Sequence, residues 1–162
     1  MPKPGDLIVV HIIDKRQVGD NFARKRLAWP LHATLVRWFT PGSIEACTPA
    51  LQQVADRHGP FEVMVGDEAD FGPEGITRVN LINDSKPLQA LHQELLTAVQ
   101  ESGGKFESER WLGDEYRAHV THHGEQRKHK GDILLIGDFH LVLVDSEDTC
   151  TIIKKFDLKP TV

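Results

Sequence analysis

The chain has 162 residues, of which 40% are hydrophobic and 27% charged, and its formal net charge is −5 with nine histidines counted as neutral. This length predicts a single domain over residues 1–162, and the composition excludes a mostly disordered chain. The acidic balance argues against tight nonspecific binding to long nucleic acid, which depends on a strongly basic face. A small site for a phosphate or an RNA end remains compatible with it.

Cysteine content and hydropathy indicate which cellular compartment the protein occupies and whether it associates with a membrane. The two cysteines, Cys47 and Cys150, lie far apart and neither has a second cysteine nearby, which excludes a zinc motif built on cysteines. A reduced, cytoplasmic protein is the simplest expectation, with one long-range disulfide as the alternative. The longest apolar run, residues 7–13, contains His11 and is far shorter than the roughly 20 apolar residues of a membrane span. We therefore expect no association with a membrane.

Seven segments are rich in β-forming residues and are bounded by turn-forming ones, which predicts strands. In chain order they are residues 6–13, 29–39, 61–70, 76–83, 117–123, 139–144 and 149–158. Turns are expected at 72–75 and at 146–148. Two polar, basic stretches, 14–28 and 125–132, predict loops.

Two amphipathic segments predict helices. Ser43 is a suitable N-cap for a helix over residues 44–58, which Gly59 would end. Ser85 is the N-cap of a second helix, which ends at the glycines 103–104. Long strands combined with two capped helices indicate an α+β or mixed α/β domain.

A His-x-Thr sequence occurs twice, at residues 32–34 and at residues 119–121, each time inside an apolar, strand-like run. Side chains alternate between the two faces of a strand, so the histidine and the threonine of each copy point the same way. A single His-x-Thr on a strand is more often structural than functional. Two copies with matching faces, one in each half of the chain, favour a shared functional site.

The residue types in these two copies suit chemistry on a phosphate. His32 and His119 can divide the roles of general base and general acid, because an unperturbed imidazole titrates near about pH 6.5. Thr34 and Thr121 can donate hydrogen bonds to the phosphate oxygens on which charge develops. Such a mechanism requires no metal.

The two copies resemble the motif of the 2H phosphoesterase superfamily, which includes bacterial RNA 2′,3′-cyclic phosphodiesterases, also called 2′-5′ RNA ligases. The family motif is His-x-Thr/Ser-hydrophobic, present twice. Residues 32–35 fit it fully, whereas the second copy has His122 in place of the apolar residue and Ala118 where many members have proline.

The resemblance implies an α+β fold with two lobes, pseudo-two-fold symmetric antiparallel sheets, flanking helices and a central cleft. It implies metal-independent opening of 2′,3′-cyclic phosphates, or action on 2′-5′ linkages, in RNA ends or nucleotides. His32 would act as the acid and His119 as the base. The resemblance implies no cofactor, no obligate protein partner and no association with a membrane.

Further residues near the motifs are candidates for contacts with the substrate. Arg117 and Trp38 share the strand face of the motif residues, and His123 follows the second copy. Two basic clusters flank the motif strands and predict a rim that faces RNA. They comprise Arg24, Lys25 and Arg26, and Arg127, Lys128 and Lys130.

Two other functions remain as alternatives. A module that binds nucleotides or RNA ends without turnover would have the same cleft, but it would not need intact His and Thr pairs. A zinc site at His119, His122 and His123 is disfavoured, because His122 faces away from His119 on a strand and the segment contains no Asp or Glu.

Overall fold

The computed structural model describes residues 2–72 and 75–159. Two α-helices are present in these ranges, α1 (Ile44–Asp56) and α2 (Lys86–Glu101), together with short 3-10 turns at Arg26–Ala28 and Gly113–Glu115. The strands are β1 (Leu7–Ile12), β2 (Asn21–Ala23), β3 (His32–Phe39), β4 (Phe61–Phe71), β5 (Thr77–Ile82), β6 (His119–Thr121), β7 (Ile133–Ile136), β8 (Asp138–Val144) and β9 (Thr149–Asp157). Neither helix in the described ranges has the length and apolar character needed to cross a membrane.

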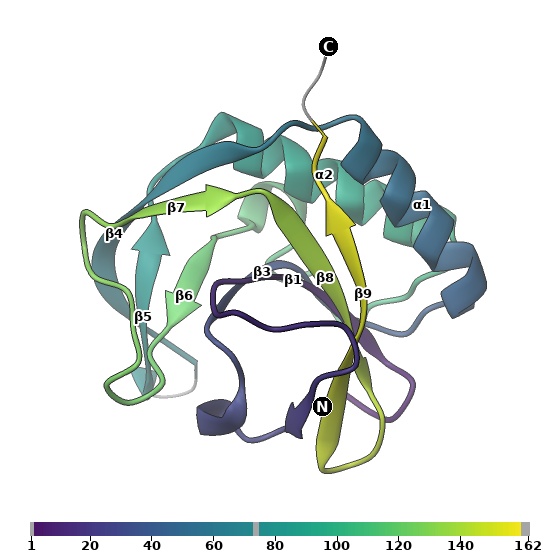
Figure 1. The fold of residues 1–162 in the computed structure, drawn as a ribbon, viewed down its shortest axis with the longest axis horizontal. Helices are drawn as coiled ribbons and strands as arrows, with labels where there is room; N and C mark the ends of the chain where they lie inside the picture. Colours follow the sequence, from purple (N-terminus) through teal and green to yellow (C-terminus); the bar gives the residue numbers. More distant parts are fainter. Residues whose placement is uncertain (1, 73–74, 160–162) are drawn as a thin grey trace.

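The strands form one sheet in the order β2-β9-β8-β1-β3-β6-β5-β4-β7, in which neighbouring strands are antiparallel. The two strands that carry the His-x-Thr copies, β3 and β6, lie side by side at its centre (Figure 1). On either side of this junction the arrangement repeats, because β3 is flanked by β1 and β6 by β5. The predicted α+β architecture with two antiparallel, pseudo-symmetric lobes and flanking helices is confirmed.

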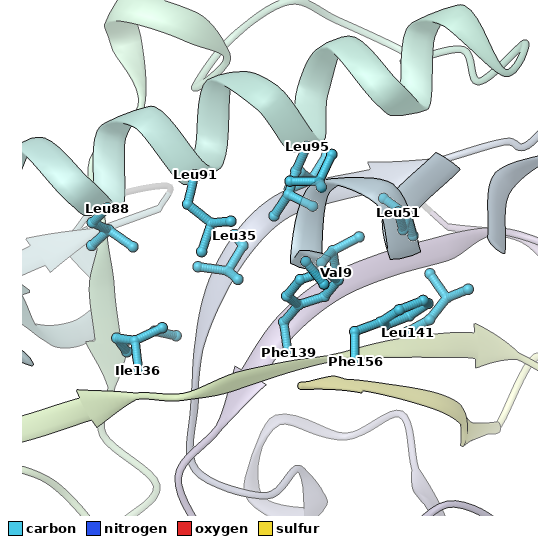
Figure 2. Packing of buried hydrophobic residues seen from close by; sticks show 14 of the residues in the cluster. Val9, Leu35, Leu51, Leu88, Leu91, Leu95, Ile136, Phe139, Leu141 and Phe156 are labelled. Atoms are coloured by element: carbon cyan, nitrogen blue, oxygen red, sulfur yellow. The ribbon is translucent and has the colours of Figure 1, made fainter. Parts of the chain in front are cut away.

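Both helices cover the same side of the sheet (Figure 1). Leu91 and Leu95 of α2 point from the helix toward the sheet, where Leu35 of β3 lies (Figure 2). Ala33 and Val120, the middle residues of the two motifs, belong to the same buried cluster. Burying a Leu or Phe side chain contributes about 1.5–3 kcal/mol. This cluster therefore holds the helix-facing side of β3 and β6 in place and leaves the motif histidines and threonines on the opposite side.

The predicted helix caps are confirmed. The Ser43 side chain accepts a hydrogen bond from the backbone N–H of Ala46 at 3.0 Å, and the Ser85 side chain accepts one from the N–H of Leu88 at 3.2 Å. Each serine thus satisfies one of the N–H groups that a helix start leaves without a partner. The predicted turn at 72–75 is described only at its ends, Gly72 and Gly75, because residues 73–74 lie outside the described residues.

Two short strands differ from the sequence prediction. The predicted loop over 14–28 is wrong at β2, where Phe22 is buried against the sheet and Asn21 pairs with Thr151 of β9. A second unexpected strand, β7, pairs with β4 at the edge of the sheet and exposes the side chains of Ile133 and Leu135. Strands of three or four residues contain too few alternating positions to be recognised before their distant partners are known.

Three predicted boundaries are also shifted. The strand expected over 29–39 begins at His32, after Pro30, which lacks the N–H that a ladder needs. The strand expected over 117–123 is only the three residues of β6, and α1 ends at Asp56 rather than at residue 58.

The alternative of a long-range disulfide is wrong, because both cysteines are free and buried.

Candidate active site

The pairing of β3 with β6 brings the two motifs together. Ala33 lies opposite Val120 in an antiparallel ladder, so the histidine of each motif lies opposite the threonine of the other. Ala33 and Val120 are fully buried toward the helices, and the four motif side chains are half-buried on the other face. Two imidazoles and two hydroxyls therefore share one small area of the sheet.

A cleft opens at this area. It consists of two cavities of about 400 and 390 Å³, which share Ile8, Thr34, Trp38 and Thr77 in their walls. The first cavity also contacts His32, Thr121 and His123, and the second contacts His119 and Arg117. Thr34 thus lies at the boundary of two adjoining cavities, one for each motif histidine.

Both histidines are held by the same hydrogen bond. His32 Nδ1 lies 2.8 Å from the carbonyl oxygen of Pro30, and His119 Nδ1 lies 2.9 Å from that of Arg117. In each motif the partner is thus the residue two positions earlier. Because a carbonyl only accepts, each Nδ1 must donate, which leaves Nε2 as the ring atom that can take up or release a proton.

The surroundings of both histidines favour the neutral imidazole. The pKa of His32 is lowered to about 4, mainly by burial and also by the neighbouring His123 and His119, against the opposing hydrogen bond to Pro30. Burial also lowers the pKa of His119, and the positive charge of Arg117 acts in the same direction. Without an anionic ligand, both imidazoles are therefore neutral at neutral pH.

Aromatic rings pack against each imidazole. The centroid of the Trp29 ring lies 4.9 Å from that of the His32 ring and 5.8 Å from that of the Trp38 ring. On the other side, the rings of Phe71 and His119 meet edge to face with 4.7 Å between their centroids, and Phe71 stacks on Trp111 at 5.7 Å. Trp29, Phe71 and Trp111 are not among the candidates from the sequence. Phe71 and Trp111 lie far from the motifs along the chain, and in the strand expected over 29–39 the side chain of Trp29 would face away from that of His32.

The buried His92 and the half-buried Tyr116 connect the two motif strands. His92 of α2 donates from Nδ1 to the carbonyl of Leu35 at 2.6 Å and accepts at Nε2 from the N–H of Gly113 at 3.0 Å. The ring of Tyr116 stacks on His92 at 3.9 Å, and its hydroxyl donates to the carbonyl of Thr34 at 2.7 Å. Burial lowers the pKa of His92, which keeps this doubly bonded imidazole neutral. The pair thereby ties β3 to the segment that leads into β6.

Several candidates from the sequence analysis lie at the cleft. Trp38, Arg117, His123 and Arg24 are in its walls. Arg24 is fixed there by hydrogen bonds to the carbonyls of Pro2 and Glu147 at 2.8 and 2.9 Å. Lys25 is exposed beside an adjoining cavity of about 820 Å³, which Arg24 also contacts. The side chain of Arg26 lies outside the described part of the structure.

The second basic cluster is engaged elsewhere. Arg127 forms an ion pair with Glu68 at 3.2 Å, and Lys130 forms one with Asp67 at 2.7 Å. Lys128 is half-buried and is not in the walls of either cleft cavity. The acidic partners on β4 offset the positive charge that this cluster would offer to RNA.

His122 does not join the motif histidines. Its Nε2 lies 2.6 Å from Oδ1 of the buried Asn80, on the neighbouring strand β5. Within residues 2–72 and 75–159, no group of three or more His, Cys, Asp or Glu side chains is placed to hold a metal ion.

The family follows from comparison with known proteins. A model of the 2′-5′ RNA ligase superfamily matches residues 4–128, a stretch that includes both His-x-Thr copies. The chain belongs to this superfamily. A comparison with curated protein sequences found no match.

Solved structures share the fold of this superfamily member at low sequence identity. Escherichia coli LigT, in a crystal structure with 3′-AMP, is 18% identical with a TM-score of 0.58, over 98% of this chain and 100% of LigT. TT0787 of Thermus thermophilus is 15% identical with a TM-score of 0.63, over 97% and 100% of the two chains. Usb1 of Kluyveromyces marxianus is 11% identical with a TM-score of 0.55, over 96% and 99%.

The link between the motif strands can be tested with Tyr116→Phe. Loss of the hydroxyl leaves the Thr34 carbonyl without that donor, so we expect the free energy of unfolding to fall by about 1–3 kcal/mol in urea denaturation. Thr97→Ala removes an exposed hydroxyl from α2 and should change it by less than about 0.5 kcal/mol. Equal effects of the two substitutions would contradict the proposed link.

Proposed function

We propose that this protein is a phosphoesterase that opens 2′,3′-cyclic phosphates, or acts on 2′-5′ linkages, in RNA ends or nucleotides. The observation that carries the proposal is the antiparallel pairing of the two His-x-Thr copies across one cleft. Each imidazole has its Nδ1 engaged by a carbonyl and its Nε2 available for proton transfer. An acid and a base on either side of one phosphate are what the opening of a cyclic diester requires.

The roles follow the resemblance to 2H phosphoesterases. His119 Nε2 takes a proton from water, whose oxygen attacks the phosphorus. The bond between phosphorus and the ribose O3′ breaks, and the imidazolium of His32 gives its proton to O3′, so that a 2′-phosphate remains. The hydroxyls of Thr34 and Thr121 donate to the non-bridging oxygens, where negative charge develops. The scheme uses no metal ion.

The size and charge of the cleft support a nucleotide ligand. Cavities of about 400 and 390 Å³ fall in the usual range for small-molecule sites, and Arg24 and Arg117 in their walls suit an anion. The structural relative LigT has been crystallised with 3′-AMP, NADP+, ATP and phosphate. The shared fold makes nucleotides the first ligands to test here.

The catalytic pair can be tested with His32→Ala and His119→Ala. Each substitution should lower kcat for adenosine 2′,3′-cyclic phosphate by about 10²–10⁴, the usual contribution of a positioned acid or base. His129→Ala, at a histidine of the loop after β6 that is in neither cleft wall, is the matched control and should retain kcat. The assay contains EDTA. Near wild-type kcat in either site variant, or loss of wild-type activity in EDTA, would contradict the mechanism.

The lowered pKa values predict an acidic pH optimum. The reactive free protein has one neutral and one protonated imidazole, and this state is most populated between the pKa values of the pair. Because burial lowers the pKa of both His32 and His119, kcat/KM should peak below pH 6.5 and fall through neutrality. The bound anionic phosphate favours imidazolium, so kcat should peak at higher pH than kcat/KM. A kcat/KM maximum at or above about pH 7 would contradict this assignment.

The two basic clusters differ in what they can offer RNA. Lys25 is exposed beside the cavity that Arg24 also contacts, whereas Lys130 is paired with Asp67. Lys25→Gln should therefore raise KM severalfold for an oligoribonucleotide ending in a cyclic phosphate. The slope of log KM against log salt concentration should also fall by about 1, because one contact with a phosphate is lost. Lys130→Gln serves as the charge-matched control, with a smaller effect. Equal effects of the two substitutions would indicate only a change in net charge.

A further inference from the structure

The second motif copy differs from the first in the residue that follows its threonine. In the first copy this residue is Leu35, which is fully buried in the core beneath the helices. In the second copy it is His122, whose Nε2 lies 2.6 Å from Oδ1 of Asn80, a fully buried side chain of β5. Burying a polar side chain is costly unless it is hydrogen-bonded, so this pair calls for an explanation. The proposed mechanism uses neither side chain.

Asn80 connects three parts of the chain. Its Nδ2 donates to the carbonyl of Gly66 on β4 at 2.9 Å, which leaves Oδ1 as the acceptor for other donors. Oδ1 accepts from His122 Nε2 and also from Nη2 of Arg127 at 3.2 Å. Nη1 of Arg127 donates to Glu68 of β4 at 3.2 Å. We call Asn80, His122 and Arg127 the Asn80 clamp.

The Asn80 clamp closes the base of a turn. His122 and Arg127 flank residues 123–126, and within this turn His123 and Gln126 exchange backbone hydrogen bonds at 2.9 and 3.1 Å. The turn follows the arrowhead of β6, beside the start of β5 (Figure 1). One buried oxygen thus accepts a hydrogen bond from the residue before the turn and another from the residue after it.

The turn places His123 in the candidate active site. His123 is only 6% exposed, and it lines the same cavity as His32 and Thr121. The centroids of the His123 and His32 rings are 6.2 Å apart. Two imidazoles at this separation repel each other when both carry a proton. The position of His123 therefore affects how readily His32 holds its proton.

We propose that the Asn80 clamp holds His123 beside His32, which makes Asn80 and Arg127 positioning residues for the proposed acid. The role of His32 as the acid rests on the proposed function, whereas the placement of His123 does not. An imidazolium that is disfavoured by its neighbour gives its proton to O3′ more readily. Asn80 and Arg127 are in neither cleft wall, and they would thus influence the proton of His32 through His123 alone.

The other charged groups near His32 lie outside the turn. His119 of β6 disfavours the imidazolium of His32, Asp14 in the loop after β1 favours it, and Arg24 lines the same cavity. None of these three belongs to residues 122–127. Loosening the clamp should therefore leave their effects on His32 in place and remove that of His123.

The charged groups around the clamp keep it closed at neutral pH. Burial lowers the pKa of His122, and the positive charge of Arg127 acts in the same direction. Arg78 and His129 also lower this pKa, whereas Glu68 opposes them. His122 is therefore neutral at neutral pH, and its Nε2–H donates to the amide oxygen of Asn80.

The test measures the pKa of His32 directly, by NMR titration of its Cε1–H in the full chain. His123→Gln should raise this pKa by about 0.5, which is the effect of a like charge roughly 6 Å away across water. Arg127→Met should give about half of this rise or more, because the freed turn lets His123 move away. Lys130→Met is the charge-matched control in the same loop, where Lys130 pairs with Asp67, and should have a smaller effect.

Two further variants separate the clamp from net charge. In the double variant His123→Gln/Arg127→Met, the pKa of His32 should rise no more than in His123→Gln alone, because Arg127 acts through His123. Arg127→Lys keeps the charge but cannot bond Asn80 and Glu68 together, so it should also raise the pKa. The proposal is overturned by equal rises after Lys130→Met and Arg127→Met, by additive rises in the double variant, or by no rise in Arg127→Lys or in His123→Gln.

The titration does not require turnover, so the clamp and the proposed function are tested separately. A wild-type protein that does not open adenosine 2′,3′-cyclic phosphate would overturn the proposed function, and the titration would still decide whether the clamp positions His123. In an active protein, Arg127→Met should also move the maximum of kcat/KM to higher pH, whereas Lys130→Met should move it less. An unmoved maximum in Arg127→Met would overturn the role of Arg127 as a positioning residue.

Discussion

The geometry of the candidate active site depends on the contact between β3 and β6, where Ala33 lies opposite Val120. Side chains on a strand alternate, so a slip of one residue at this contact would turn one motif toward the helices. The register is held because Ala33 and Val120 fill the buried layer beneath α2. The His92–Tyr116 pair adds hydrogen bonds to the carbonyls of Leu35 and Thr34. The core and the site are therefore specified by opposite faces of the same strands.

Burial gives the two histidines their chemical character, and burial follows from the aromatic rings around them. Trp29 packs on His32 and Phe71 packs on His119, so each imidazole lies in surroundings that disfavour its charged form. The same surroundings strengthen the interaction of an imidazolium with a phosphate, because partly buried charges are screened less than exposed ones. A bound anion would therefore shift the protonation of the pair more than it would at an exposed site. In the proposed mechanism, this couples the binding of the substrate to the protonation of the acid.

The sequence predicts local features of the site better than long-range ones. The strand alternation of His32 with Thr34 and of His119 with Thr121 follows from two short motifs, and the helix caps follow from the residues beside them. Pairing partners are not local. Phe71 and Trp111 meet only because β4 and the segment before β6 are brought together by tertiary structure. One available signal was missed, since His92 interrupts the apolar stripe of α2, where a polar side chain requires buried partners.

The two halves of the sheet repeat the same motif, but the surroundings of the two copies differ. His32 has His123 and Trp29 as neighbours, in a cavity that also contacts Arg24, whereas His119 has Phe71 in contact and Arg117 close by. The two imidazoles thus have identical backbone arrangements but unlike neighbours, and burial among those neighbours lowers the pKa of both. In the proposed mechanism, the symmetry of the fold places the pair on either side of a phosphate, and the unlike walls of the two cavities give the two sides of that phosphate different neighbours.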